Sequence, residues 1–263
     1  MRTKTKVWLL VATSLVLVGG ILFAGVMTTL GWDFSKLSTV QYESNLYTID
    51  KPYQNIRIIT DTAHITLVPS QNAVTSIDCY EQNNVKHSVA VEGDTLVVQV
   101  VDTRAWYEHI GITVDSPYVK ITVPKRAYNA LTIQADTSDV EIAKELHVNS
   151  IDVSTTTGDV INRAAFCQNV TIQTSTGDVC LDHITATETI SVVSSTGDVT
   201  MNASDGAELH ITTSTGDVTG TLLTEKVFIT QTETGDVEVP PSTTGGRCEI
   251  TTDTGDVSIT LCS

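Results

Sequence analysis

Alternating apolar and polar residues fill the chain from about residue 131 onward and recur with a regular spacing. Each alternating stretch ends at the tetrapeptide Thr-Gly-Asp-Val, which occurs six times after a degenerate Thr-Ser-Asp-Val at 137–140. The Asp residues lie 19 or 20 positions apart, at Asp139, Asp159, Asp178, Asp198, Asp217, Asp236 and Asp256. A period of this length is typical of stacked structural repeats.

Alignment of the copies on the Asp reveals four apolar columns, at eight and six residues before it and at one and three after it. Every position in these columns is apolar except Asn162, Gly220 and Thr230. A separation of two is the side-chain period of a strand, and one repeat alone buries little surface. The pattern therefore predicts an all-β solenoid, similar to a β-helix, of about seven coils. A meander of hairpins is the alternative, but it would not so readily require the same turn in every copy.

The Thr-Gly-Asp step is the predicted corner of each coil. Glycine tolerates the positive φ that a sharp corner needs, and an Asp carboxylate accepts hydrogen bonds from nearby backbone N–H groups. The predicted turn glycines are Gly158, Gly177, Gly197, Gly216, Gly235 and Gly255. The hydroxyl residues two and four positions before the Asp are expected to share the inward face and to form ladders between coils.

The region before the repeats has less regular strands. Ile56, Ile58, Ile65 and Leu67 fit the four apolar columns of a further coil, in which His64 replaces the Asp. Further strands are predicted over Val74–Tyr80, Val89–Val91, Leu96–Val101 and Val119–Val123. We interpret residues 45–130 as an N-terminal β cap with a degenerate first coil, which covers one open edge of the solenoid at 131–263.

The N-terminal region is predicted to be a membrane anchor. Val7–Leu30 is a stretch of 24 residues without charge, long enough as a helix to cross a bilayer. Basic residues precede it, which predicts a cytoplasmic N-terminus at residues 1–6, a linker at 31–44 and an extracytoplasmic C-terminal part. A cleaved signal peptide is the alternative, although the apolar run is longer than is usual for one.

The net charge and the scarcity of aromatic residues limit the functions that are compatible with this sequence. A net charge of −16 argues against nucleic-acid binding, which needs a basic face. Aromatic residues make up 5 % of the chain, so stacking surfaces for sugars or bases are scarce. The six histidines are scattered, and no nucleophile elbow, phosphate loop or helical zinc motif occurs. We therefore expect a protein that is not an enzyme and that needs no cofactor.

Two features of the repeats carry candidate chemistry. The stacked carboxylates of Asp159, Asp178, Asp198, Asp217, Asp236 and Asp256 are a candidate calcium ladder, although we favour a structural role in the turns. Among the five cysteines, Cys248 and Cys262 are a candidate disulfide pair. Free thiols in the core are an equal alternative.

The segment Tyr-Val-Lys-Ile-Thr-Val-Pro-Lys at 118–125, followed by Leu-Thr-Ile at 131–133 and the repeats, resembles the bacterial putative-adhesin family of unknown function. The resemblance covers about residues 45–261. It implies a repeated β fold in the cell envelope, often behind a membrane anchor, and some members are encoded with envelope-stress systems. It implies no catalytic residues.

These observations together favour a non-catalytic, membrane-anchored module that acts like an adhesin in the cell envelope. Its expected contacts are the membrane through Val7–Leu30, a protein or envelope-polymer ligand, and a second copy through the edge of the C-terminal coil, Cys248–Leu261. The first alternative is an accessory or sensory subunit of an envelope-stress system. A weaker alternative is a polysaccharide-processing enzyme.

Overall fold

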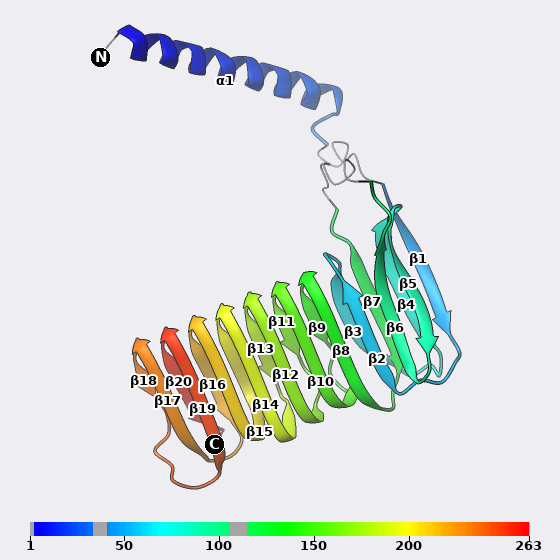
Figure 1. Cartoon of the computed structure of the whole chain (residues 1–263), viewed down its shortest axis with the longest axis vertical. Coiled ribbons are helices and arrows are strands. Elements are labelled where there is room, and N and C mark those ends of the chain that lie inside the picture. The colour runs from blue at the N-terminus through cyan, green and yellow to red at the C-terminus, as the bar shows by residue number, and fades with distance from the viewer. Residues whose placement is uncertain (1–2, 34–40, 106–114, 263) are drawn as a thin grey trace. The chain divides into compact units, whose positions relative to one another are not determined.

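The computed structural model describes residues 3–33, 41–105 and 115–262, which form two compact units (Figure 1). The first unit comprises Met1–Gln41 and Arg104–Asp115, and the second comprises Tyr42–Thr103 and Ser116–Ser263. Arg2 of the expected cytoplasmic segment and residues 34–40 of the expected linker lie outside the described residues.

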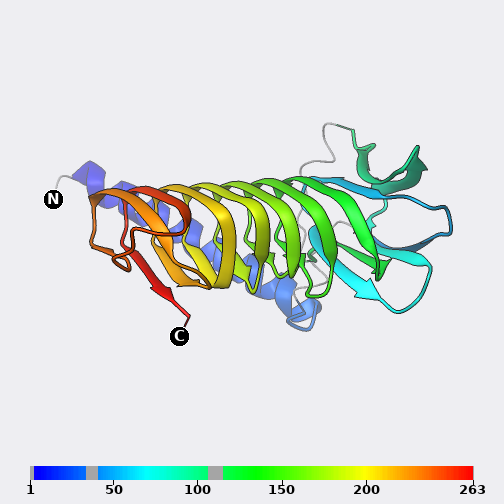
Figure 2. The same cartoon turned by 90° about the horizontal axis from the view of Figure 1, so that it is seen from below.

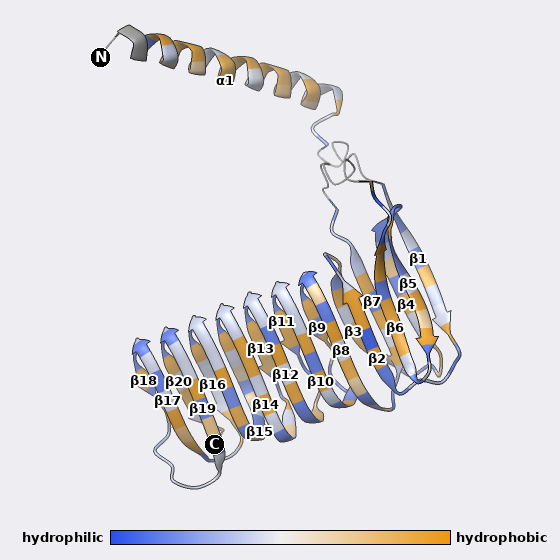
Figure 3. Ribbon diagram, in the orientation of Figure 1, coloured by the Kyte–Doolittle hydropathy of each residue, from blue (hydrophilic) through white to orange (hydrophobic). Residues whose placement is uncertain are grey.

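The first unit contains one helix, α1 (Thr3–Thr29). Within it, Lys6–Thr29 is long and apolar enough to cross a membrane, which agrees with the predicted span (Figure 3). By length and composition, a helix with these properties near an N-terminus is compatible with a transmembrane anchor and with a signal sequence.

The second unit is a β-solenoid, as the repeats predict. Each coil has a strand on one face, the Thr-Gly-Asp corner, and a shorter strand on the other face (Figure 2). The first-face strands are β8 (Ala127–Thr137), β10 (His147–Thr157), β12 (Phe166–Thr176), β14 (Thr185–Thr196), the second half of β15 (Val199–Thr215), β17 (Lys226–Thr234) and β19 (Gly246–Thr254). The opposite face holds β9 (Val140–Ile142), β11 (Val160–Asn162), β13 (Val179–Asp182), the first half of β15, β16 (Val218–Leu222), β18 (Val237–Glu238) and β20 (Val257–Leu261).

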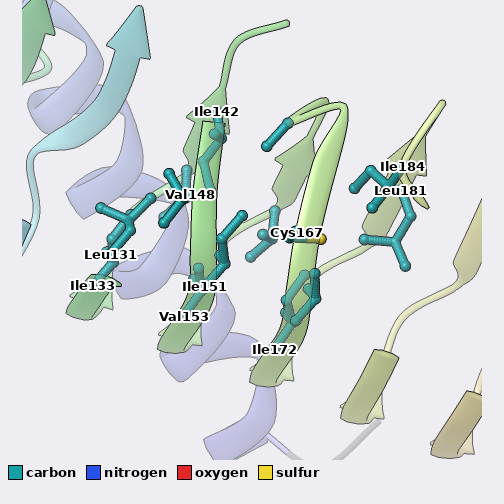
Figure 4. Packing of buried hydrophobic residues seen from close by; sticks show 14 of the residues in the cluster. Leu131, Ile133, Ile142, Val148, Ile151, Val153, Cys167, Ile172, Leu181 and Ile184 are labelled. Atoms are coloured by element: carbon teal, nitrogen blue, oxygen red, sulfur yellow. The ribbon is translucent and has the colours of Figure 1, made fainter. Parts of the chain in front are cut away.

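The strands of neighbouring coils pair in parallel, which excludes the alternative of a meander of antiparallel hairpins. Ile151 lies opposite Leu131 on one side and Val170 on the other, so equivalent positions of successive repeats stack directly. The four apolar columns thereby form a continuous core, part of which Figure 4 shows around Ile133, Val153 and Ile172. Burial of each such aliphatic side chain stabilises the fold by about 1.5–3 kcal/mol.

The cap extends both faces of the solenoid beyond β8 and β9. Its strands are β1 (Tyr42–Ile49), β2 (Asn55–Thr60), β3 (His64–Ser70), β4 (Thr75–Gln82), β5 (Val85–Glu92), β6 (Thr95–Asp102) and β7 (Tyr118–Pro124). β2 and β3 pair in parallel with β8 and β9, and β6 and β7 form a further coil outside them. Antiparallel strands β5, β4 and β1 then complete this end.

The order of the last two coils in space is the reverse of their order in the chain. β19 and β20 pair with β15 and β16 on one side and with β17 and β18 on the other. The outermost coil is therefore β17–β18, which we call the end coil, while the C-terminal coil lies between it and the rest of the stack (Figure 1). The expectation that Cys248–Leu261 forms the free edge is wrong, because the C-terminal segment inserts one layer deeper.

The repeated glycine is needed because the coils approach closely at the corner. Gly197 has φ +141°, and a Cβ built on it would lie 2.1 Å from the carbonyl oxygen of Gly177 in the adjacent coil. No side chain fits at that distance. The same approach recurs at each turn glycine, so the motif is required by stacking as well as by backbone conformation.

The hydroxyl residues before the Asp differ in their placement. The hydroxyl residues four positions before it are buried in all but the end coil. Thr155 and Thr213 donate to the carbonyl groups of Ser138 and Gly197, whereas Thr174 and Ser194 have no hydrogen-bond partner among the described residues. The hydroxyl residues that lie two positions before the Asp, such as Thr157, are exposed. The expectation that both share the inward face is wrong, because the strict alternation ends as the strand enters the corner.

Candidate functional site

The aspartates of the repeats form a hydrogen-bonded ladder along one corner of the solenoid. In each step the main-chain N–H of one Asp donates to Oδ1 of the Asp in the adjacent coil, at 2.8–2.9 Å. The spatial order is Asp139, Asp159, Asp178, Asp198, Asp217, Asp256 and Asp236. The carboxylates therefore bond across coils rather than within their own turn.

The two ends of this ladder differ. At the cap end, Nδ1 of His64 lies 3.2 Å from Oδ2 of Asp139, so the histidine does occupy the place of the Asp in its coil. At the other end, Asp236 belongs to the end coil and its side chain is exposed. The bonds to backbone N–H groups favour a structural role for the carboxylates, and calcium binding along the ladder stays a prediction.

The five cysteines are unpaired in the structure. Cys248 is fully buried in the core of the C-terminal coil, whereas Cys262 follows β20 and is exposed. The structure therefore does not contain the candidate disulfide between them. Burial raises the pKa of Cys248 to about 12 and that of Cys167 to about 11, which keeps both thiols protonated and unreactive.

The end coil leaves part of the core open. Phe228 and Val239 are partly buried, and Val237, which occupies a column that is fully buried in the inner coils, is 42 % exposed. In the described part of the chain no strand pairs with the outer side of β17 or β18. An unpaired edge of this kind is a template for another strand.

The unpaired edge of the end coil is also negatively charged. Glu225, Glu233, Asp236 and Glu238 are exposed on or beside the end coil. Its lysine, Lys226, is buried, with Nζ 2.5 Å from Oδ1 of Asp205. The edge therefore combines apolar surface with an excess of carboxylates, a combination that favours a strand bearing basic residues.

A buried polar cluster in the cap was not predicted. Nδ1 of His87 lies 2.8 Å from Oε2 of Glu81, and Nε2 of His87 lies 3.0 Å from the hydroxyl of Thr60. Sγ of Cys79 also lies within 4.8 Å of the histidine and carboxylate ligand atoms. A sequence signal did exist, because Glu81 continues the inward alternation of Thr75, Ile77 and Cys79 into a core position.

A solved structure with a TM-score above 0.5 is similar to this fold. A crystal structure of a putative adhesin from Bacteroides fragilis has a TM-score of 0.55 at 18 % identity, covering 84 % of this chain and 97 % of that one. A putative cell adhesion protein from Clostridium sporogenes has a TM-score of 0.41 at 7 % identity, covering 84 % and 100 %. A comparison with curated proteins finds no match.

The family comparison agrees with the repeat pattern and the observed stack of coils. The Toastrack DUF4097 family matches residues 53–262, which span the cap from before β2 to the end of the C-terminal coil. The match includes the Asp ladder, the end coil and the buried cluster of the cap. The chain therefore belongs to the Toastrack DUF4097 family.

Proposed function

We propose that this protein is a non-catalytic, membrane-anchored interaction module on the extracytoplasmic side of the cell envelope, acting like an adhesin. The observation that supports this proposal is the open end coil. In the described part of the chain no strand pairs with the outer side of β17 or β18, and Val237, which lies in a core column, is 42 % exposed. The name of the Bacteroides fragilis neighbour, a putative adhesin, supports binding as the role.

The geometry of the end coil favours a protein partner that adds an extended strand. β17 spans Lys226–Thr234, long enough for several main-chain hydrogen bonds to a partner strand. Apolar side chains of that strand would cover Phe228 and Val237, and its basic side chains would pair with the surrounding carboxylates. A carbohydrate polymer would leave the apolar part uncovered, so it fits this edge less well.

The test compares Val237→Lys with Val193→Lys in the full-length protein. Val237 and Val193 are 42 % and 43 % exposed, but Val193 lies on β14 in the middle of the stack. After cross-linking in intact cells and purification, the Val237→Lys variant should lose its co-purified partner while the Val193→Lys variant keeps it. Equal recovery with both variants would refute the role of the end coil.

A second comparison separates this function from an envelope-stress role. Replacing Val7–Leu30 by an unrelated membrane helix should leave ligand binding intact in an interaction module, because the binding edge lies in the solenoid. An accessory subunit that signals through membrane contacts should lose its regulatory effect after the same replacement.

A further inference from the structure

We propose that Cys79, Glu81 and His87 form a binding site for a zinc-like divalent cation inside the cap. The three side chains offer a cysteine sulfur, a carboxylate oxygen and an imidazole nitrogen within 4.8 Å of one another. Cys79 and Glu81 share the inward face of β4, and His87 reaches them from β5. All three are buried, with Glu81 1 % and His87 4 % exposed.

The surroundings hold these donors in place. The other oxygen of Glu81, Oε1, accepts a hydrogen bond from Nδ2 of Asn45 at 2.8 Å. The backbone N–H of His87 donates to Oε2 of Glu81 at 2.7 Å. Partners that orient the ligating groups in this way are a regular feature of metal sites.

A small cavity adjoins two of the donors, Glu81 and His87, while Cys79 does not line it. It has a volume of about 20 Å³, and its lining includes Thr60, Glu81 and His87. That volume accommodates one water molecule or an ion of similar size. Glu81 and His87 border this space, so it leaves room for a water molecule beside a cation held by the three protein donors.

The proton balance of binding is simple. Cys79 loses its S–H proton to become the thiolate ligand. With Nδ1 of His87 as the ligand, the ring proton is carried by Nε2, which donates to the hydroxyl oxygen of Thr60, 3.0 Å away. Nδ1 and Glu81 then both face the cation, and one proton is released for each ion bound.

The donor set selects the class of cation. Thiolate and imidazole favour zinc and similar transition metals, whereas calcium and magnesium prefer oxygen ligands alone. The site is therefore chemically distinct from the Asp ladder, and it does not depend on the proposed binding role of the end coil. A bound ion would cross-link β4 and β5, the strands that form the hairpin of the cap.

The experiment uses full-length protein in detergent, without an affinity tag and stripped by chelator, then loaded with Zn²⁺ or Co²⁺. We expect one metal ion per chain after gel filtration and a thiolate-to-Co²⁺ charge-transfer absorption. Cys79→Ala should abolish that absorption, and both Cys79→Ala and His87→Gln should weaken Zn²⁺ binding at least tenfold. Cys167→Ala, which removes a different buried thiol, should change neither.

Thermal melting of each stripped variant controls for folding. Zn²⁺ should raise the melting temperature of the parent but not that of Cys79→Ala. Cys79→Ala removes only a thiol group, so this variant should keep the fold even if His87→Gln does not. Absence of retained metal in the parent would overturn the proposal. Unchanged binding and an unchanged Co²⁺ spectrum in Cys79→Ala would overturn it equally.

Discussion

The main-chain N–H of Asp236 donates a hydrogen bond to Oδ1 of Asp256 at 2.8 Å, although Asp236 comes earlier in the sequence. In every other step of the ladder the donor is the later residue, and Asp256 itself donates to Asp217. This reversal places the C-terminal coil inside the stack. The end coil, with its open edge and exposed carboxylates, is consequently the outer boundary of the solenoid.

The Asp ladder should stabilise the fold because its carboxylate oxygens accept hydrogen bonds, and not because the carboxylates are charged. Oδ1 of Asp198 accepts from the N–H of Asp217 at 2.8 Å. Asp198→Ala removes this acceptor and should lower the free energy of unfolding by about 1 kcal/mol. Asp198→Asn keeps an acceptor oxygen and reduces like-charge repulsion, so it should be neutral or slightly stabilising. Urea denaturation measures both variants, and equal destabilisation by Asn and Ala would contradict this account.

Calcium should have little effect on the folded state if the ladder is structural. One oxygen of each inner carboxylate already accepts a backbone N–H, and calcium sites need several oxygen donors for each ion. Millimolar calcium should therefore leave the melting temperature within about 1 °C of its value in chelator, since the midpoint rises only when a ligand binds the folded state. A large rise would identify the Asp column as a cation ladder.

The buried ion pair between Lys226 and Asp205 should be essential to the end coil. It joins the start of β17 to β15, and Thr224 also donates to Asp205 at 2.7 Å. Lys226→Met leaves the buried Asp205 carboxylate without its cation, which should cost about 3–5 kcal/mol.

The control for this pair is Arg163→Met, which removes more exposed ion pairs with Glu141 and Asp182. It should cost at most about 1 kcal/mol. The double variant Lys226→Met/Asp205→Asn should recover part of the loss, because no uncompensated charge stays buried. Similar denaturation midpoints for Lys226→Met and Arg163→Met would show that the buried pair is not needed.

The thiols should react in the order of their exposure. Cys262 is exposed and Cys180 is half-buried, while burial raises the pKa of Cys248 to about 12. A thiol reagent in the presence of chelator should label Cys262 rapidly and Cys180 more slowly, and the other three only after unfolding. If Cys262 is labelled only after reduction, a disulfide is present and the unpaired arrangement is wrong.

The sequence was sufficient to predict the core of each coil but not the order of the coils. Alternation with a period of two correctly places Leu131 and Ile151 inside, because that period follows from strand geometry. Identical Thr-Gly-Asp-Val corners make neighbouring coils interchangeable, so the motif does not specify which coil packs on which. Thr230 and Asn162 each interrupt an apolar column, but Asn162 is buried in an inner coil, so a polar residue in a column does not identify the end coil.

The buried cluster of the cap depends on contacts that no local motif encodes. Glu81 and His87 meet because β4 and β5 are consecutive strands of a hairpin, and Thr60 reaches them from β2. A search for helical or closely spaced metal ligands does not detect donors that are joined across strands. The inward position of Glu81 became informative only once the register of the hairpin was known.

The most direct test of the central claim is site-specific photo-cross-linking at Ile229 and at Val193 in intact cells. Both aliphatic side chains are similarly exposed, at 46 % and 43 %, but Ile229 lies on the end coil and Val193 on an inner one. A photoreactive residue at 229 should give a discrete adduct that is absent with the same residue at 193. An adduct at 193 but not at 229, or none at either position, would contradict partner binding at the end coil.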